Sequence, residues 1–349
     1  MEKRVLIRCD ASPTLGHGHL VRCLALAEAL VRAGDLRPEF AVLGDDAAAR
    51  AVAAAGHVCH RATDAESDEG EWLLSLVKRT GADALVCDVR TGLSPAALEA
   101  VRDLGVLVAV IDDPAPRRLA ADLAFYPPVS EVERLDWVGF GGRRFVGWDW
   151  LVLRAGFSGV RRRVRALNGR RVRTLVAMGG SDPAGLTLKA LAGLEPLAAE
   201  LEVAVVLGGG FCHEAALAAF LAESKLAPVL HRAVTDMPGL MGEMDLAVAS
   251  FGMTAYELAA IGVPAVHLCL TEGHASAAQS LVEAGQATSL GLHGEVGPEQ
   301  IAAEVRAWLG RIRVPQFELE RVIDGQGAMR IARCLAESVL TPAAVRVSP

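Results

Sequence analysis

Two histidines stand in the segment Asp10–His19, where His17 and His19 alternate with Gly16 and Gly18. The segment follows a short apolar run and precedes an amphipathic stretch, which predicts a loop between a first strand and a first helix. Such loops bind ligands in open α/β sheets, because glycines admit a close approach and the helix start offers free N–H groups. A neutral imidazole there could act as a general base. The alternative is that both histidines are polar loop residues and one caps the helix.

Carboxylates at the ends of two expected strands are further candidates for catalysis. Asp10 follows the first strand, and Asp112 and Asp113 follow the strand expected over 106–111. Two adjacent acids point in different directions, so at most one of this pair faces a ligand. We take Asp113, together with Asp10, as the candidate catalytic carboxylates.

A second pair of glycines, Gly179 and Gly180, stands with Ser181 at the end of the strand expected to open the second half. These residues would let a ligand approach the backbone closely. Asp182 before Pro183 predicts the N-cap and the first residue of a helix. The alternative is therefore that this motif only starts a helix.

A third candidate site joins a strand to a short helix and could hold a diphosphate through backbone amides and small hydroxyls. Its residues are Ser250, Phe251, Gly252, Met253 and Thr254. Glu257 has two interpretations. With Thr254 it fits a capping box, which would be a structural role. Its carboxylate could instead accept hydrogen bonds from the two hydroxyls of a ribose.

Short apolar runs alternate with amphipathic stretches along the whole chain. The expected strands are Val5–Ile7, Glu39–Leu43, His57–His60, Ala84–Cys87, Val106–Ile111, Leu123–Phe125, Val172–Met178, Leu201–Leu207, Asp245–Ala249, Pro264–Leu268 and Ala287–Leu290. Helices are expected near 20–31, 72–77, 183–194, 213–222, 254–261, 275–284 and 315–340. This alternation predicts an α/β fold with two doubly wound, Rossmann-like domains that face a cleft. We expect an N-terminal catalytic and sugar-binding domain over 1–155 and a nucleotide-binding domain over 156–349, whose last helix is free to pack back on the first.

The apolar content is high, with 52% hydrophobic and 22% charged residues among 349. Yet the longest stretch without a polar side chain, Val203–Cys212, is well short of the roughly 18 residues that a membrane span needs. The first apolar run is broken by Arg8, so no signal-peptide core is expected. These patterns predict a cytoplasmic protein with no integral membrane segment.

Several classes of partner and cofactor are disfavoured by the sequence. The net charge is −7 and only 5% of residues are aromatic, which argues against nucleic acid. The seven cysteines are dispersed, as is typical of reduced thiols rather than of a zinc site. The first strand is not followed by a dinucleotide fingerprint, and the chain contains neither a Walker loop nor a compact cluster of metal ligands. We therefore expect neither a metal nor a cofactor.

Taken in order, several segments resemble one known family. They are Arg8–Ser12 and Gly16–His19, the following helix with Arg22 and Leu24–Ala27, Ile111–Asp113, Gly147–Arg154 and Met178–Asp182. Over roughly residues 4 to 290 the chain resembles the UDP-2,4-diacetamido-2,4,6-trideoxy-β-L-altropyranose hydrolases of pseudaminic acid biosynthesis, to which spore-coat polysaccharide proteins are similar. In that family the residue directly after the second glycine is the catalytic histidine. The resemblance therefore favours His19 over His17.

The second half also resembles the peptidoglycan N-acetylglucosaminyltransferase and other glycosyltransferases of the GT-B fold. The resemblance implies that the backbone at Val234 and Thr235 contacts uracil, that Ser250–Thr254 hold a diphosphate and that Glu257 binds ribose. The hydrolase family often has an Asn-Gln pair near the sugar. Here that place is taken by 271–275, so His274 becomes a candidate sugar contact.

The resemblance implies metal-independent hydrolysis of a UDP-linked deoxy amino sugar to the free sugar and UDP. The expected context is pseudaminic acid synthesis for flagellin glycosylation, or surface-polysaccharide synthesis. One alternative is a glycosyltransferase of the same fold, in which His19 deprotonates an acceptor hydroxyl. Another is a non-catalytic protein that binds a nucleotide sugar.

Overall fold

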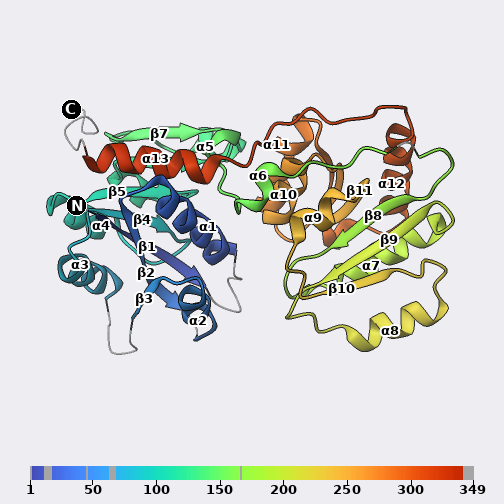
Figure 1. Ribbon diagram of the computed structural model, residues 1–349, viewed down its shortest axis with the longest axis horizontal. Helices are drawn as coiled ribbons and strands as arrows, with labels where there is room; N and C mark the ends of the chain where they lie inside the picture. The colour runs from blue at the N-terminus through green and yellow to red at the C-terminus, as the bar shows by residue number, and fades with distance from the viewer. Residues whose placement is uncertain (1, 12–17, 45, 63–67, 166, 341–349) are drawn as a thin grey trace. The chain divides into compact units, whose positions relative to one another are not determined.

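The protein is described by a computed structural model over residues 2–11, 18–44, 46–62, 68–165 and 167–340. These residues form two compact units (Figure 1). One unit comprises the described residues up to Ala155 and those from Gly325 onward, and the other comprises Gly156–Asp324. Each unit is built on one parallel β-sheet, which confirms the predicted α/β class.

The described residues of the first unit form a seven-stranded sheet with the order β3-β2-β1-β4-β5-β6-β7. The strands are β1 (Lys3–Ala11), β2 (Leu36–Gly44), β3 (Val58–Arg61), β4 (Ala84–Asp88), β5 (Leu107–Ile111), β6 (Leu123–Tyr126) and β7 (Arg143–Val146). The helices are α1 (Gly18–Ala33), α2 (Asp46–Ala54), α3 (Glu69–Thr80), α4 (Pro95–Asp103), α5 (Ser130–Arg134) and α13 (Gly327–Leu340). Because neighbouring strands are parallel, their carboxyl ends meet at one edge of the sheet.

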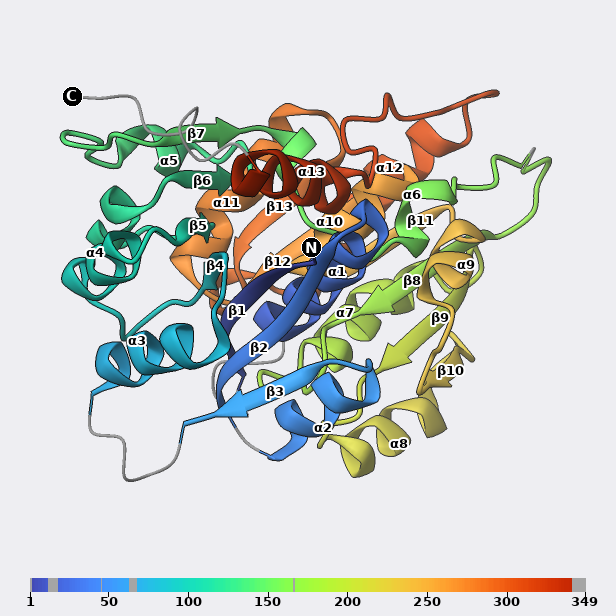
Figure 2. The ribbon, with the colours of Figure 1, turned by 60° about the vertical axis from the view of Figure 1, so that its left-hand side comes forward.

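Helices cover both faces of this sheet, which explains why its strands are nearly continuous apolar runs. Helices α1, α2 and α13 pack on one face, where Ile7 and Val86 are fully buried against Leu26 and Ile331. Helices α3 and α4 lie on the opposite face (Figure 2). Helix α13 approaches the segment before residue 155 very closely: a Cβ atom on Gly327 would lie 2.1 Å from the carbonyl oxygen of Leu151.

The described residues of the second unit form a six-stranded sheet with the order β10-β9-β8-β11-β12-β13. The strands are β8 (Val172–Ala177), β9 (Leu201–Leu207), β10 (Val229–Arg232), β11 (Leu246–Ser250), β12 (Ala265–Cys269) and β13 (Ala287–Leu292). The helices are α6 (Gly156–Gly159), α7 (Leu186–Leu194), α8 (Glu214–Glu223), α9 (Met237–Gly242), α10 (Met253–Ile261), α11 (Glu272–Glu283) and α12 (Pro298–Ile312). Helices α7 and α12 share one core with the sheet, centred on Val176, Leu191 and Trp308.

Several elements differ from the sequence expectation, among them helices α2, α4, α5 and α12, which were not expected. Edge strands β7 and β10 were not expected, because their partly exposed sequences, Arg143–Val146 and Val229–Arg232, carry charged residues instead of a buried apolar run. The long helix expected over 315–340 begins only at Gly327, and the helix before it is α12. None of the helices within the described ranges is long and apolar enough to cross a membrane.

Candidate functional site

A hydrogen-bonded histidine–aspartate pair lies at the carboxyl edge of the first sheet. Asp88 is the last residue of β4 and His19 is the second residue of α1. Ala84 and Val86 pack on the α1 side of the sheet, and the two-residue period of a strand places Asp88 on that same side. The His19 Nδ1 atom lies 2.6 Å from Asp88 Oδ1. Asp88 is fully buried, whereas 14% of the His19 side chain is exposed.

Arg22, one turn further along α1, holds the same carboxylate with two hydrogen bonds. Its Nε donates to Asp88 Oδ2 at 2.7 Å and its Nη2 donates to Oδ1 at 2.5 Å. Burial alone would raise the pKa of Asp88. The Arg22 charge and the hydrogen bonds from His19 and Arg22 outweigh that effect and hold the pKa well below its usual range. Asp88 is therefore ionised at neutral pH.

The ionised carboxylate determines which nitrogen of His19 carries the hydrogen. A carboxylate can only accept hydrogen bonds, so His19 Nδ1 is the donor in the contact with Asp88. In the neutral form of the imidazole, Nε2 keeps a lone pair, and within the described part of the chain this atom makes no hydrogen bond to another residue. This arrangement orients a base and would stabilise the imidazolium that forms when Nε2 takes a proton.

Asp112 extends this cluster beyond the histidine. Its Oδ2 accepts from Arg22 Nη1 at 3.2 Å and from Arg90 Nη2 at 2.8 Å. Asp112 lies just after β5 and has a φ of 52°, in the left-handed region that side chains other than asparagine and aspartate seldom adopt. Of the adjacent pair of acids, Asp112 is thus the one that joins the group around His19.

Asp10 and Asp113 lie on the other face of the sheet, apart from His19. Asp10 Oδ1 is 2.8 Å from Arg8 Nη1, and Asp113 Oδ2 accepts from Arg117 Nε at 2.6 Å. Burial raises the pKa of Asp113, against the opposing effects of the Ala115 N–H and Arg117. The structure therefore brings neither carboxylate to His19, and their catalytic roles stay predictions.

The remaining candidates of the first unit lie near the start of α1. Gly18 is the first residue of that helix, and a Cβ atom at Gly18 would meet open space. Gly16 and His17 lie outside the described residues. The choice of His19 over His17 accordingly rests on the contact of His19 with Asp88.

In the second unit, a glycine-rich turn follows β8. Gly179 has a φ of 85°, which favours glycine, and a Cβ atom there would lie 3.8 Å from Ser250 Oγ. A Cβ atom on Gly208, after β9, would lie only 2.2 Å from the carbonyl oxygen of Gly180. These close approaches bring the loops after β8, β9 and β11 together at the carboxyl edge of this sheet, with Ser181 exposed beside them.

The prediction that Asp182 is the N-cap and Pro183 the first residue of a helix is wrong, because the N-cap of α7 is Gly185. The two carboxylate oxygens of Asp182 accept from the N–H groups of Leu186 and Thr187, at 2.7 and 2.8 Å. Helix α7 begins at Leu186 rather than at Pro183. Asp182 therefore satisfies free amides at the start of α7 and is not available for a ligand.

The third candidate segment joins β11 to α10. Ser250 ends the strand, and α10 begins at Met253 after Gly252. Thr254 is thus the second residue of the helix and cannot be its N-cap, so the capping-box interpretation of Glu257 is wrong. Glu257 is largely buried, with 7% of its surface exposed.

Aromatic and imidazole rings gather around Phe251 in this segment. The Phe251 ring centroid lies 5.5 Å from that of Tyr256, 5.8 Å from that of His267 and 5.9 Å from that of His274. His274 lies in the first turn of α11, where its N–H donates to Thr271 Oγ1 at 3.1 Å. The structure therefore brings His274 to the Ser250–Thr254 segment, although the two are separate in sequence.

Val234 and Thr235 lie between β10 and α9, at the same carboxyl edge of the sheet. Helix α9 starts at Met237, and the N-cap Asp236 accepts from the N–H of Gly239 at 2.9 Å. Within the described residues, no group of three or more histidine, cysteine, aspartate or glutamate side chains could hold a metal ion.

Two residues of the first cluster, Asp88 and Asp112, were missed as site residues from the sequence. Asp88 was overlooked because the strand was expected to end at Cys87, one residue too early. The signal that could have found it is the one used for Asp10, a carboxylate directly after a buried apolar run.

Comparison with known proteins gives relatives by sequence and by fold. No protein-family model matches the chain. It is 29% identical over 201 residues to the spore coat polysaccharide biosynthesis protein SpsG of Bacillus subtilis (strain 168), covering 56% of this chain and 58% of that protein. It is 27% identical over 277 residues to an uncharacterized protein of Methanocaldococcus jannaschii, covering 77% of this chain and 56% of that protein. The matches thus span less than two thirds of either relative.

The solved structures with the same fold are more complete matches. Acinetobacter baumannii MurG has a TM-score of 0.70 at 16% identity, covering 96% of this chain and 99% of that one. The UDP-GlcNAc 2-epimerase of Neisseria meningitidis, bound to UDP-GlcNAc, has a TM-score of 0.64 at 12% identity, covering 96% and 100%. The glycotransferase of kitacinnamycin has a TM-score of 0.61 at 17% identity, covering 97% and 100%. The two parallel-sheet domains are those of the GT-B fold.

Proposed function

We propose that the protein hydrolyses a UDP-linked deoxy amino sugar to the free sugar and UDP, with His19 as the general base. The observation that carries this proposal is the 2.6 Å contact between His19 Nδ1 and the ionised Asp88 carboxylate. That contact leaves His19 Nε2 as a proton acceptor on a partly exposed side chain.

In the proposed reaction, a water oxygen bonds to the anomeric carbon while His19 Nε2 takes the water proton. The bond between that carbon and the diphosphate oxygen breaks, and its electron pair leaves with UDP. Asp88 stabilises the imidazolium, and Arg22 keeps the carboxylate in place. No metal is required by this scheme, because backbone N–H groups can stabilise the charge that grows on the leaving diphosphate.

The nucleotide is assigned to the second unit. The diphosphate would be held by Ser250–Thr254 and the glycine turn at Gly179 and Gly180, with the N-terminus of α10 directed at the anion. Glu257 would accept from the ribose hydroxyls, and Val234 and Thr235 would contact uracil through their backbone. His274 would contact the sugar. Support comes from a structural neighbour of the same fold that is bound to UDP-GlcNAc.

The surface-polysaccharide context is part of the same proposal. It is supported by the similarity to a spore coat polysaccharide biosynthesis protein over 201 residues. Synthesis of pseudaminic acid is the narrower form of this proposal, and it rests on the sequence motifs around His19 and Asp182.

The test is incubation of the protein with the UDP-linked trideoxy sugar in EDTA, followed by chromatography for UDP. We expect UDP release that His19→Ala lowers by about 100-fold or more, the usual contribution of a general base. His60→Ala is the matched control, because His60 Nε2 also contacts a carboxylate, Glu39 Oε2, at 2.9 Å, but lies on β3. UDP release only in the presence of an added acceptor would show that the protein is a glycosyltransferase and not a hydrolase. Tight UDP binding without turnover on a panel of UDP-sugars would leave a non-catalytic binding protein.

A further inference from the structure

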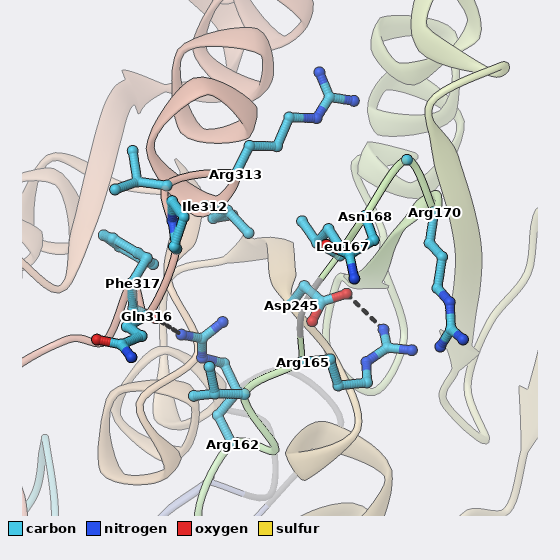
Figure 3. Close-up of a pocket in the computed structure, with 14 residues that line it drawn as sticks. Arg162, Arg165, Leu167, Asn168, Arg170, Asp245, Ile312, Arg313, Gln316 and Phe317 are labelled. Carbon is cyan, nitrogen blue, oxygen red and sulfur yellow. Dashed lines mark hydrogen bonds and ion pairs between the residues drawn. The ribbon is translucent and has the colours of Figure 1, made fainter.

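A cavity of about 560 Å³ opens in the second unit, far from the residues assigned to UDP. It lies between residues 162–165 and 167–170 before β8, Asp245 before β11, and the turn 312–317 at the end of α12 (Figure 3). These segments meet the amino ends of β8 and β11. The glycine turn and Ser250 lie at the carboxyl ends of the same two strands, about 15–20 Å away for strands of five or six residues.

The charged lining of this cavity is strongly unbalanced. Four arginines contribute to it, Arg162, Arg165, Arg170 and Arg313, against the single carboxylate of Asp245. That carboxylate is already satisfied: Asp245 Oδ2 accepts from Arg165 Nη2 at 2.6 Å and from the N–H of Arg173 at 2.9 Å. Arg313 is paired outside the lining, with Glu200 at 2.7 Å. The charges of Arg162, Arg165 and Arg170 still exceed that of Asp245, so the lining does not neutralise them.

Arg162 is the most deeply buried of these arginines, and within the described residues it donates no hydrogen bond to a carboxylate. It is only 8% exposed, and its Nη2 donates to the neutral carbonyl oxygen of Phe317 at 2.5 Å. Its buried Nε has no hydrogen-bond partner among the described residues, and the same holds for Nε of Arg165. Burial lowers the pKa of Arg162, because the charged form is poorly solvated there, and the nearby charges of Asp245 and Glu318 oppose that effect only in part. A bound anion would offset the remaining cost of the buried charge.

We propose that this cavity, which we call the arginine pocket, binds a phosphorylated small molecule. Guanidinium groups match the oxygens of a phosphate with paired hydrogen bonds, and arginine is favoured where such groups are recognised. The volume of the pocket is in the range of pockets that hold small organic ligands, well beyond one phosphate ion. Leu167, Ile312 and Phe317 supply an apolar wall for the organic part of the ligand.

Calorimetry with UDP at saturation tests this proposal, because UDP then blocks the proposed nucleotide site. The probes are inorganic phosphate, inorganic diphosphate and glucose 6-phosphate, with glucose as the uncharged control. We expect glucose 6-phosphate to bind more tightly than inorganic phosphate, and glucose not to bind. Equal affinities for glucose 6-phosphate and inorganic phosphate would contradict the organic part of the proposal and would indicate a site for free phosphate. Absence of binding by all three phosphate probes would overturn the arginine pocket.

Variants locate the binding. Arg165→Gln is expected to weaken the binding of glucose 6-phosphate at least tenfold. Arg163→Gln, a matched change at an exposed arginine outside the pocket, is expected to leave that affinity unchanged. Because Arg165 contacts the buried Asp245, Arg170→Ala is the second variant: it is exposed, and we expect a smaller but measurable loss of affinity. Equal affinities in wild type, Arg165→Gln and Arg170→Ala would contradict the assignment. UDP affinity is expected to be the same in all four proteins.

Discussion

The imidazole of His19 and the carboxylate of Asp88 form a hydrogen-bonded pair, with His19 Nδ1 2.6 Å from Asp88 Oδ1. The two residues are 69 positions apart and are brought together because α1 packs on β1 and β2, and β4 is paired with β1. Arg22 donates to both oxygens of the carboxylate and keeps it ionised. In the proposed reaction Asp88 is therefore a positioning residue, which orients His19 without needing to touch the substrate.

Replacement of Asp88 by asparagine tests that positioning role. Asparagine keeps the shape of the side chain, but it can present an N–H group to His19, which would favour hydrogen on Nε2 instead of Nδ1. We expect UDP release at saturating substrate to fall by about 100-fold or more, with a shifted pH–rate profile and little change in KM. Asp112→Asn is the control, because it makes the same change of side chain at a carboxylate that contacts Arg22 and Arg90 instead of His19. An equal loss in both variants, with unchanged pH profiles, would mean that Asp88 only supports the fold.

A substitution of Glu257 on α10 tests the proposed nucleotide site separately from the proposed catalytic base. Glu257→Gln removes the charge that would accept from the ribose hydroxyls, and charged hydrogen bonds contribute about 1.5–3 kcal/mol. We expect calorimetry to show that Glu257→Gln binds UDP at least tenfold more weakly than the wild type. Glu283→Gln, at the exposed end of α11, is the matched control. Unchanged UDP affinity in Glu257→Gln would remove Glu257 from the site.

The close packing of the loops after β8 and β9 gives a prediction for stability. A Cβ atom on Gly208 would lie 2.2 Å from the Gly180 carbonyl oxygen, whereas one on Gly209 would meet open space. Gly208→Ala should therefore cost about 1–3 kcal/mol, as other forced overpacking does. Gly209→Ala should leave stability nearly unchanged. Urea unfolding followed by circular dichroism compares the two, and equal midpoints would contradict the described contact.

His267 on β12 predicts a loss of stability in acid. It is fully buried, and burial lowers its pKa from 6.5 to about 4. Above pH 6.5 both the folded and the unfolded states hold a neutral imidazole, so His267 adds no pH dependence there. Between pH 6.5 and 4 the unfolded state binds the proton more readily, and stability falls by about 2–3 kcal/mol at pH 4.5.

The measurement for His267 is the free energy of unfolding at pH 7 and at pH 4.5, in wild type and in His267→Leu. We expect the difference between the two pH values to shrink in the variant. His231→Leu, a change at a partly exposed imidazole of β10, should keep the wild-type difference. An unchanged difference in His267→Leu would show that other groups cause the acid sensitivity.

The fold class could be predicted from the sequence because buried parallel strands such as Val5–Ile7 and Ala84–Cys87 are continuous apolar runs. The edge strands β7 and β10 could not, since a strand paired on one side and partly exposed needs no such run. At the site, the position of His19 after two glycines was informative. Its partner Asp88 was not found, because pairing across 69 residues depends on the order of β1 and β4 in the sheet and on the packing of α1 upon it, which local patterns do not encode.

The central claim is that water attacks the sugar carbon with His19 as the base, and isotope labelling tests it most directly. The protein is incubated with the UDP-linked trideoxy sugar in H2¹⁸O, and the masses of the free sugar and of UDP are measured by mass spectrometry. The account predicts one ¹⁸O atom in the free sugar and none in UDP, at a rate that His19→Ala lowers by about 100-fold or more and His60→Ala leaves unchanged. Label in UDP, or a labelled sugar formed at the wild-type rate by His19→Ala, would contradict it.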